Sequence, residues 1–292
     1  MFKIWIQAIR PKSLLVSMAP VLMAVAMASV YVDINWLPAV ICLVFAVMAQ
    51  IVSNLINDYS DGVRGSDKDR IGPERMVASG KISAKAMLRA VIIMTCLSFI
   101  LGCTLLYWGG WILLPFGIVI ILGALAYSAG PFPLSRHALG DVAVVLFYGI
   151  APVVLTYFIL TGGVNYQLFV AGIAIGIVTD NMLIVNNYRD AEQDKSNGKI
   201  TTVTIFGRPF MKMMYILNPV IAVCLGFIFL NHIIAPWVWL IAVVPYLAYS
   251  VMVSKKFAKY KGSEFNKLIG MSSLGAILFA LTVVVTIIIE YV

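Results

Sequence analysis

Charged residues are scarce in this sequence. They make up 12% of its 292 residues, whereas 62% of the residues are hydrophobic. A soluble domain keeps about a quarter of its residues charged in order to solvate its surface. The composition therefore excludes an ordinary soluble protein, and most of the chain must face lipid or the interior of a helix bundle.

Clusters of cysteine are also missing. The four cysteines lie inside apolar runs, and none belongs to a C-x-x-C or Cys/His group. This pattern is typical of small apolar residues in helix packing and argues against a zinc site or a disulfide framework.

The net charge of +8 raises the question of nucleic acid binding. The basic residues, however, sit in short loops between apolar runs, which fits anionic lipid headgroups and phosphorylated ligands better. We therefore expect membrane lipid, and no nucleic acid, among the partners.

Long apolar runs dominate what is present. A helix that crosses the hydrocarbon core needs roughly 20 mostly apolar residues. The sequence predicts an all-α, polytopic membrane protein with about nine such helices. The candidate spans are Leu14–Tyr31, Leu37–Ile56, Ala90–Trp108, Trp111–Tyr127, Leu139–Leu160, Tyr166–Val185, Met213–Leu230, Ala235–Val253 and Leu268–Ile289.

Lysine and arginine are absent from every second connection between these spans. All 21 lie before the first span or in the second, fourth, sixth and eighth connections. Because basic loops stay in the cytoplasm, we expect a cytoplasmic N-terminus and an external C-terminus. The second and sixth connections are also long and polar, so the working surface is expected on the cytoplasmic side.

Two similar asparagine/aspartate motifs follow the second and the sixth span. Asn57-Asp58-Tyr59-Ser60-Asp61 matches Asn186-Asn187-Tyr188-Arg189-Asp190. Residues three or four apart share a helix face, so segments 54–61 and 186–194 would each present a polar stripe. We interpret them as a weak internal repeat within one domain, residues 1–292, built around one shared site.

Two facing carboxylate stripes would repel each other unless a cation lay between them. Mg²⁺ takes a few carboxylate oxygens, keeps water and completes its shell with phosphate oxygens. The alternative is a pair of ordinary solvated helix ends, which the matched spacing disfavours. The predicted metal ligands are Asn54, Asp58, Asp61, Asp190 and Asp194, the four aspartates being also the predicted catalytic residues, with Asn57, Asn186 and Asn187 orienting them.

Basic residues stand beside each motif and could bind a diphosphate, since arginine forms a bidentate fork with phosphate. The cytoplasmic bias of basic residues alone is the competing explanation for their presence. The candidates are Arg64, Arg75, Lys81, Arg189 and Lys199.

These motifs resemble those of the UbiA superfamily of intramembrane prenyltransferases, and within it the MenA branch, the 1,4-dihydroxy-2-naphthoate polyprenyltransferases. The resemblance covers nearly the whole chain. Beside the two aspartate motifs it rests on Arg10-Pro11-Lys12-Ser13, Gly65-Ser66-Asp67, Arg70-Ile71-Gly72-Pro73-Glu74-Arg75, Tyr127-Ser128-Ala129-Gly130-Pro131, Leu139-Gly140-Asp141 and Gly198-Lys199.

The resemblance implies a helical bundle around a central cavity in the bacterial inner membrane. It also implies that Mg²⁺ and basic side chains bind a polyprenyl diphosphate, whose prenyl group is transferred to 1,4-dihydroxy-2-naphthoate with loss of CO₂, giving demethylmenaquinone. Tyr127, Arg136 and Asp141 would close the pocket over the aromatic acceptor. Two alternatives stay open: another acceptor within the superfamily (hydroxybenzoate, homogentisate, haem or a glyceryl phosphate), and a cation-coupled transporter.

Asp180 departs from the apolar residue that the resemblance leads us to expect in the middle of the sixth span. At about 100° per residue it shares a helix face with Asn187 and Asp194. A carboxyl at this depth is a candidate for function. We expect it to be protonated, and either to hydrogen-bond within the bundle or to line the acceptor or prenyl cavity.

Overall fold

The computed structural model describes residues 1–65 and 72–291. Over these residues the chain is helical, and its only β-pairing is one isolated bridge between His137 and Ile200. Residues 66, 67, 70 and 71 of the motifs quoted above, and Lys68, lie outside the described part.

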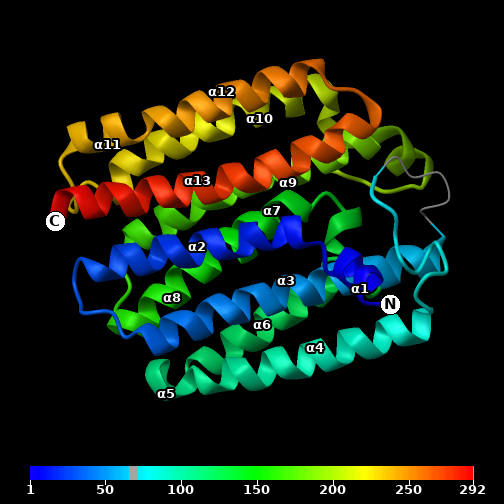
Figure 1. Cartoon of the computed structure of the whole chain (residues 1–292), viewed down its shortest axis with the longest axis horizontal. Coiled ribbons are helices and arrows are strands. Elements are labelled where there is room, and N and C mark those ends of the chain that lie inside the picture. The colour runs from blue at the N-terminus through cyan, green and yellow to red at the C-terminus, as the bar shows by residue number, and fades with distance from the viewer. Residues whose placement is uncertain (66–71, 292) are drawn as a thin grey trace.

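The helices follow the predicted spans closely (Figure 1). Eight helical stretches in the described residues are long and apolar enough to cross a membrane, and α6, the predicted fourth span, is apolar but shorter. The elements are α1 (Phe2–Ile9), α2 (Pro11–Ser29), α3 (Trp36–Arg64), α4 (Ala84–Thr104), α5 (Leu106–Gly109), α6 (Leu113–Ala126), η1 (Leu134–Arg136), α7 (Gly140–Val145), η2 (Leu146–Ile150), α8 (Ala151–Thr161), α9 (Tyr166–Ser196), α10 (Thr202–Phe229), α11 (Pro236–Ala242), α12 (Val244–Lys259), η3 (Gly262–Glu264) and α13 (Phe265–Tyr291).

Three spans are built from consecutive pieces. α4 continues into α5, and α11 continues into α12. Between α7 and α8 lies η2, a single π-helical turn, and Pro152 stands in the first turn of α8. A proline inside a helix cannot donate its backbone hydrogen bond and crowds the preceding turn, which explains why the helix changes its hydrogen-bond pattern here.

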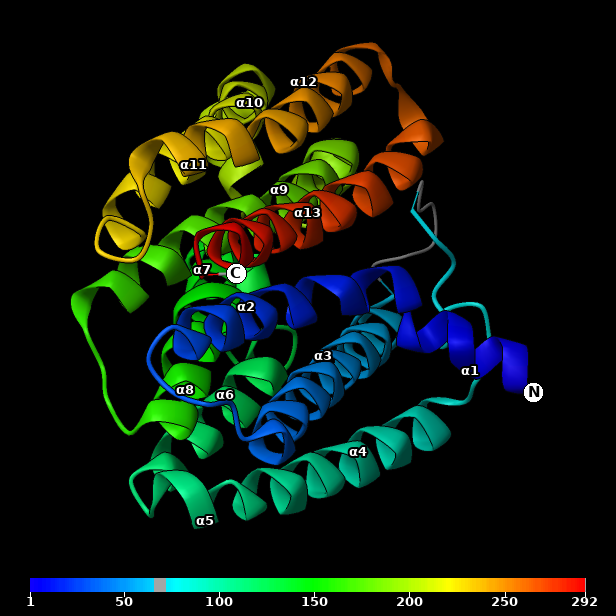
Figure 2. The same ribbon diagram turned by 60° about the vertical axis from the view of Figure 1, so that its left-hand side comes forward.

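α2, α9 and α13 form the centre of the bundle. α13 packs on both α2 and α9, and Figure 2 shows α3, α4 and α6 on one side of this centre and α10, α11 and α12 on the other. Small residues allow the close packing: a Cβ on Gly149 of η2 would lie 2.2 Å from the carbonyl oxygen of Gly172 in α9. The fixed centre holds the ends of α3 and α9 in place.

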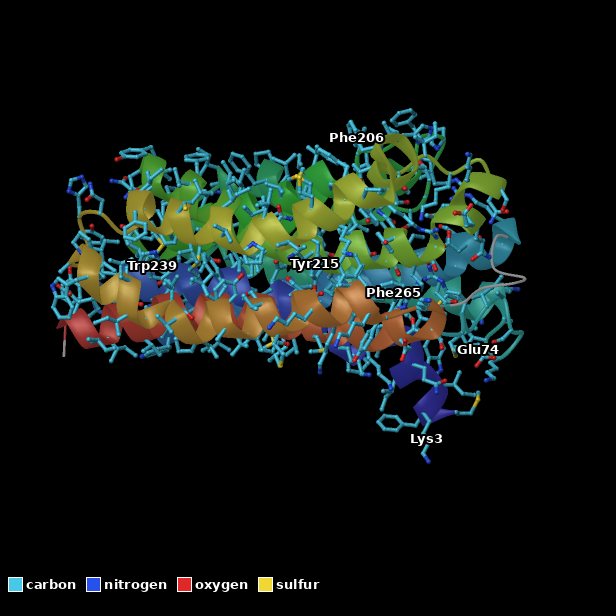
Figure 3. All side chains as sticks on the ribbon, turned by 90° about the horizontal axis from the view of Figure 1, so that it is seen from above. Lys3, Glu74, Phe206, Tyr215, Trp239 and Phe265 are labelled. Carbon is cyan, nitrogen blue, oxygen red and sulfur yellow. The ribbon has the colours of Figure 1, made fainter. Side chains whose placement is uncertain are left out.

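The two ends of the bundle differ in chemistry, as Figure 3 illustrates with Lys3 and Glu74 at one end and Trp239 towards the other. We call the end of the bundle at which the connections containing lysine and arginine lie the basic end. Exposed aromatic residues mark the opposite end, and tryptophan and tyrosine favour the membrane interface. They are Tyr31, Trp36, Tyr107, Trp111, Tyr166, Trp237 and Tyr291.

α3 and α9 are longer than their predicted spans. The sequence places the span ends at Ile56 and Val185, whereas α3 continues to Arg64 and α9 to Ser196. Both aspartate motifs are therefore helical throughout, and the faces on which their side chains lie are fixed by the helix.

Candidate functional site

A cavity of about 510 Å³ opens at the basic end, within the size range of small-molecule sites. Its wall comes from the α1–α2 turn, α3, the segment 73–76, η2 and α9, with further residues of the segments that follow α6 and α9. Both aspartate motifs reach it. The lining residues that carry its chemistry are Arg10, Lys12, Asn54, Asn57, Asp61, Glu74, Arg75, Arg136, Asn186, Asn187, Asp190, Asp194 and Lys199.

Asp61 stands in the cavity wall together with Arg75. The Arg75 Nη2 lies 2.6 Å from the Asp61 Oδ2, and the Arg75 side chain is 5% exposed while that of Asp61 is 22% exposed. The segment after α3 thus folds back over its own helix, and a carboxylate and a guanidinium face the cavity side by side.

The carboxylate of Asp58, a predicted metal ligand, is bound by two backbone N–H groups. Its Oδ2 accepts a hydrogen bond from the Met76 backbone N–H at 3.0 Å, and its Oδ1 accepts one from the Val77 N–H at 2.9 Å. The residue is 1% exposed and lies behind the cavity wall. Adjacent helix residues point in different directions, so Asp58 faces the 76–77 backbone while Asn57 and Asp61 face the cavity.

Arg189, which the sequence predicts to bind diphosphate, is engaged with other side chains of the protein. Its Nε and Nη2 bind the two carboxylate oxygens of Asp190 at 2.6 Å each, and its Nη1 donates to Asn266 at 2.6 Å. Its Nη2 also donates to Asn186 Oδ1 at 2.8 Å. The side chain is fully buried, so Arg189 holds three cavity residues from behind.

Asp194 and Lys199 form the next pair along the wall. The Lys199 Nζ lies 3.0 Å from the Asp194 Oδ2, and the Lys199 backbone N–H donates to the Asp194 carbonyl at 2.8 Å. Gly198 supplies the left-handed turn, with φ of 62°, that brings the chain back. A partly exposed ammonium group therefore faces the cavity.

Two further predicted cations lie away from the cavity. The Arg64 guanidinium donates to the Ser128 carbonyl at 3.0 Å, and Lys81 pairs with the Glu74 carboxylate on the exposed surface. The Lys81 ammonium lowers the pKa of Glu74 from its usual value by its hydrogen bond to that carboxylate. Arg64 and Lys81 therefore stabilise the segments that cover the site, Arg64 the one after α6 and Lys81 the one after α3.

Arg10 and Lys12 line the cavity and were absent from the predicted cations. Arg10 ends α1 with φ of 56°, a left-handed conformation that costs a non-glycine residue about 1–2 kcal/mol. The Arg10-Pro11-Lys12-Ser13 motif was the available signal. Its position beside the aspartates depends on how the α1–α2 turn docks, which no local pattern gives.

Asn54, a predicted metal ligand, lines the cavity and secures that turn. Its Nδ2 donates to the Ile9 carbonyl at 2.7 Å and to the Ser13 Oγ at 2.9 Å. Its Oδ1 accepts from the Gln50 Nε2 at 3.1 Å. All of its polar atoms are therefore engaged within the protein.

The carboxylate and amide oxygens of the cavity wall suit Mg²⁺. No group of three His, Cys, Asp or Glu side chains in the described ranges stands close enough to hold a metal. Mg²⁺ commonly uses only one or two carboxylates together with substrate phosphate oxygens. The Asn57 Nδ2 donates to Ser128 at 2.8 Å, and its buried Oδ1 accepts no hydrogen bond from the described residues. That orphaned oxygen, beside Asp61, fits a hydrated cation.

The structure places the four residues predicted for the acceptor pocket in two groups. Tyr127 and Arg136 line the cavity. Asp141 and Asp180 lie behind it and hydrogen-bond each other. The Thr202 Oγ1 lies 3.0 Å from both oxygens of Asp141. A bond between two carboxyls needs a proton on one of them, so the pair acts as a buried tie between α7, α9 and α10.

A second, apolar cavity adjoins the first. It lies between α2, α3, α6 and α8, and is lined mainly by aliphatic and aromatic side chains such as Val21, Phe45, Phe147 and Leu155. The two cavities share four lining residues, Gln50, Ser53, Tyr127 and Tyr148. A charged group could bind in the polar cavity while an attached hydrocarbon chain lies in the apolar one.

Comparison with known proteins agrees with this arrangement. The 1,4-dihydroxy-2-naphthoate octaprenyltransferase of Escherichia coli K12 is 32% identical over 250 residues, covering 82% of this chain and 80% of that protein. The enzyme of the same name from Mycobacterium tuberculosis is 30% identical over 236 residues, covering 81% and 80%.

Solved structures show the same fold at low sequence identity. A UbiA homologue from Archaeoglobus fulgidus bound to GPP and Mg²⁺ superposes with a TM-score of 0.69 at 17% identity, covering 97% of this chain and 99% of that one. A homologue from Aeropyrum pernix K1 gives 0.70 at 13% identity, covering 93% and 97%. The model of the UbiA prenyltransferase family matches residues 17–274. The chain is a membrane protein of the UbiA prenyltransferase family.

Proposed function

We propose that this protein transfers a polyprenyl group from its diphosphate to 1,4-dihydroxy-2-naphthoate, with loss of CO₂, giving demethylmenaquinol, the quinol whose separate oxidation yields demethylmenaquinone. The observation that carries the proposal is that the two cavities adjoin and share the lining residues Gln50, Ser53, Tyr127 and Tyr148. A polar chamber with carboxylates and cations joins an apolar one, which matches a ligand with a diphosphate head and a hydrocarbon tail. The names of the bacterial relatives support the naphthoate as acceptor.

Mg²⁺ is the proposed cofactor: one or two of the cavity carboxylates of Asp61, Asp190 and Asp194 would hold it, together with the Asn57 Oδ1 and substrate phosphate oxygens. When bound, it would neutralise diphosphate charge and so favour departure of the leaving group. A homologue of the same fold was solved with GPP and Mg²⁺, which supports this assignment.

The basic side chains of the wall are assigned to the diphosphate. Arg10, Lys12, Arg75 and Lys199 line the cavity and present cationic groups to it. As the allylic C–O bond breaks, its electron pair passes to the diphosphate oxygen, and fixed cations stabilise that charge. The electron-rich ring then forms the new C–C bond, and the carboxylate leaves as CO₂, returning its bonding electrons to the ring.

We further propose that residues 1–292 act as one domain in the bacterial inner membrane, with the basic end in the cytoplasm. The distribution of lysine and arginine supports this orientation. Charged substrates made in the cytoplasm would then meet the polar cavity directly, and the prenyl tail would enter from the lipid.

A purified, detergent-solubilised preparation tests the proposal. We expect prenylated 1,4-dihydroxynaphthalene, diphosphate and CO₂ in equal amounts, and we expect EDTA to stop the reaction and added Mg²⁺ to restore it. Hydroxybenzoate and homogentisate serve as competing acceptors in parallel. Preferential prenylation of either would assign the protein to another acceptor, and ion flux without prenyl transfer would make it a transporter.

A further inference from the structure

Four polar side chains stand where the polar cavity meets the apolar one. We call this junction the neck and define it by the shared lining residues Gln50, Ser53, Tyr127 and Tyr148. The π-turn η2 carries Tyr148. Of the four side chains, that of Gln50 has a buried oxygen without a hydrogen-bond partner among the described residues.

The orientation of the Gln50 carboxamide follows from its neighbours. The Ile9 carbonyl can only accept, so the Asn54 nitrogen, 2.7 Å away, must face it. The Asn54 Oδ1 then faces Gln50, and the Gln50 Nε2 donates to it at 3.1 Å and to the Ser13 Oγ at 3.3 Å. This chain of bonds leaves the Gln50 Oε1 as the free end of the amide.

That oxygen is buried and accepts no hydrogen bond from the described residues, and Gln50 itself is 5% exposed. A buried acceptor without a donor is destabilised relative to one that accepts a hydrogen bond. The oxygen belongs to a residue of the neck, so a bound ligand that carries a donor can satisfy it.

The proposed substrates differ in what they can donate. A magnesium-bound diphosphate offers only acceptor oxygens, and a prenyl chain offers no polar hydrogen. An aromatic acceptor with phenolic hydroxyls offers an O–H donor. Building on the proposed function, we propose that the Gln50 Oε1 accepts a hydrogen bond from a ring hydroxyl of the aromatic acceptor and so seats the ring at the neck.

This seat places the reacting atoms together. The donor's first allylic carbon lies between a diphosphate in the polar cavity and a tail in the apolar one, which is at the neck. A ring held by Gln50 is therefore next to the carbon that it attacks. An accepted hydrogen bond also draws the hydroxyl proton towards Gln50 and raises the electron density of the ring, without the charge of a base.

The test compares 1,4-dihydroxy-2-naphthoate with its 1-methoxy and 4-methoxy analogues, which cannot donate at the blocked position. Equilibrium binding is measured in the presence of an unreactive thio-diphosphate donor, with wild type and Gln50→Met, a variant of similar length. We expect wild type to bind one methoxy analogue about tenfold more weakly than the parent, and Gln50→Met to lose most of that difference.

Ser13→Ala is the matched control, since it removes a shared partner of Gln50 and Asn54 and leaves the Oε1 in place. We expect it to keep the wild-type preference for the hydroxyl. If Gln50→Met does not fold, the analogue series on wild type still decides, because equal binding of all three compounds would overturn the inference. So would an unchanged preference in Gln50→Met. Product formation is recorded separately: binding that depends on Gln50 without any prenyl transfer would contradict the proposed function and not this inference.

Discussion

Arg189 binds both carboxylate oxygens of its sequence neighbour Asp190, at 2.6 Å each, from a fully buried side chain. Neighbouring residues on a helix do not normally face each other, but the long arginine side chain curls back to reach Asp190. Its remaining nitrogen fixes Asn266, another cavity residue. The Arg189 guanidinium, buried behind the cavity wall, thus fixes the position of the Asp190 carboxylate in that wall.

Replacing Arg189 should therefore lower the stability of the fold more than it lowers substrate affinity. Arg189→Ala removes the fork that binds both oxygens of the buried Asp190 carboxylate, and breaking such a pair typically costs about 3–5 kcal/mol. Arg189→Lys lacks the fork and should recover only part of this. We expect a clear fall in thermal unfolding temperature for both, measured in detergent.

Lys199→Ala provides the contrast, because Lys199 is partly exposed and faces the cavity. We expect a change in unfolding free energy below about 1 kcal/mol and a higher KM for the prenyl donor. A stable Arg189→Ala whose only defect is donor KM would return Arg189 to the diphosphate-binding set.

Substitutions of Asp58 and Asp61 should distinguish a loss of stability from a loss of activity. Asp58→Asn keeps one acceptor oxygen for two backbone N–H groups, so one buried donor is left unsatisfied, at a cost of about 1–3 kcal/mol. Asp61→Asn removes a cavity carboxylate and should lower kcat by about 100-fold or more. The apparent Mg²⁺ affinity, from activity titrations, should fall in Asp61→Asn and stay near wild type in Asp58→Asn. Equal losses of Mg²⁺ affinity would place both carboxylates at the metal.

Arg10→Gly should improve the turn and damage the site. Glycine adopts φ of 56° without the strain that arginine bears, so the unfolding temperature should hold or rise. The cavity loses one cation, and the donor KM should rise about tenfold, as for one charge-assisted hydrogen bond. An unchanged donor KM would show that Arg10 does not contact the diphosphate, and Arg10→Lys, which keeps the charge, is the control.

The membrane orientation can be tested by labelling single cysteines in a variant that lacks Cys42, Cys96, Cys103 and Cys224. Gly110→Cys lies in the third connection and Ser263→Cys in the eighth. We expect an impermeant thiol reagent to label only Gly110→Cys in intact cells, because basic connections stay inside. Labelling of both positions from outside would refute the predicted topology.

The helices and the motif faces could be predicted because both depend on local repeats. Apolar length gives the spans, and the spacing of Asn57 and Asp61 places both on one side of α3. Helical spacing could not show what Asp58 and Arg189 contact, because their partners Met76, Val77 and Asn266 are brought close only by folding. Sequence spacing gives the direction in which a side chain points along its own helix, but not which neighbouring segment covers it.

Asp180 shows this limit and gives the last prediction. Asp180 lies on the same face of α9 as Asn187, as the spacing indicates. However, α7 packs on α9 there, so Asp180 contacts Asp141 and does not reach the cavity. Asp180→Asn keeps the pair, because the amide can donate to an Asp141 carboxylate as the carboxyl proton did. We expect it to retain most activity and wild-type Mg²⁺ affinity. Asp180→Leu leaves Asp141 with Thr202 as its remaining side-chain partner in this group, and should lower the unfolding free energy by about 1–3 kcal/mol. A large loss of Mg²⁺ affinity in Asp180→Asn would instead make Asp180 part of the metal site.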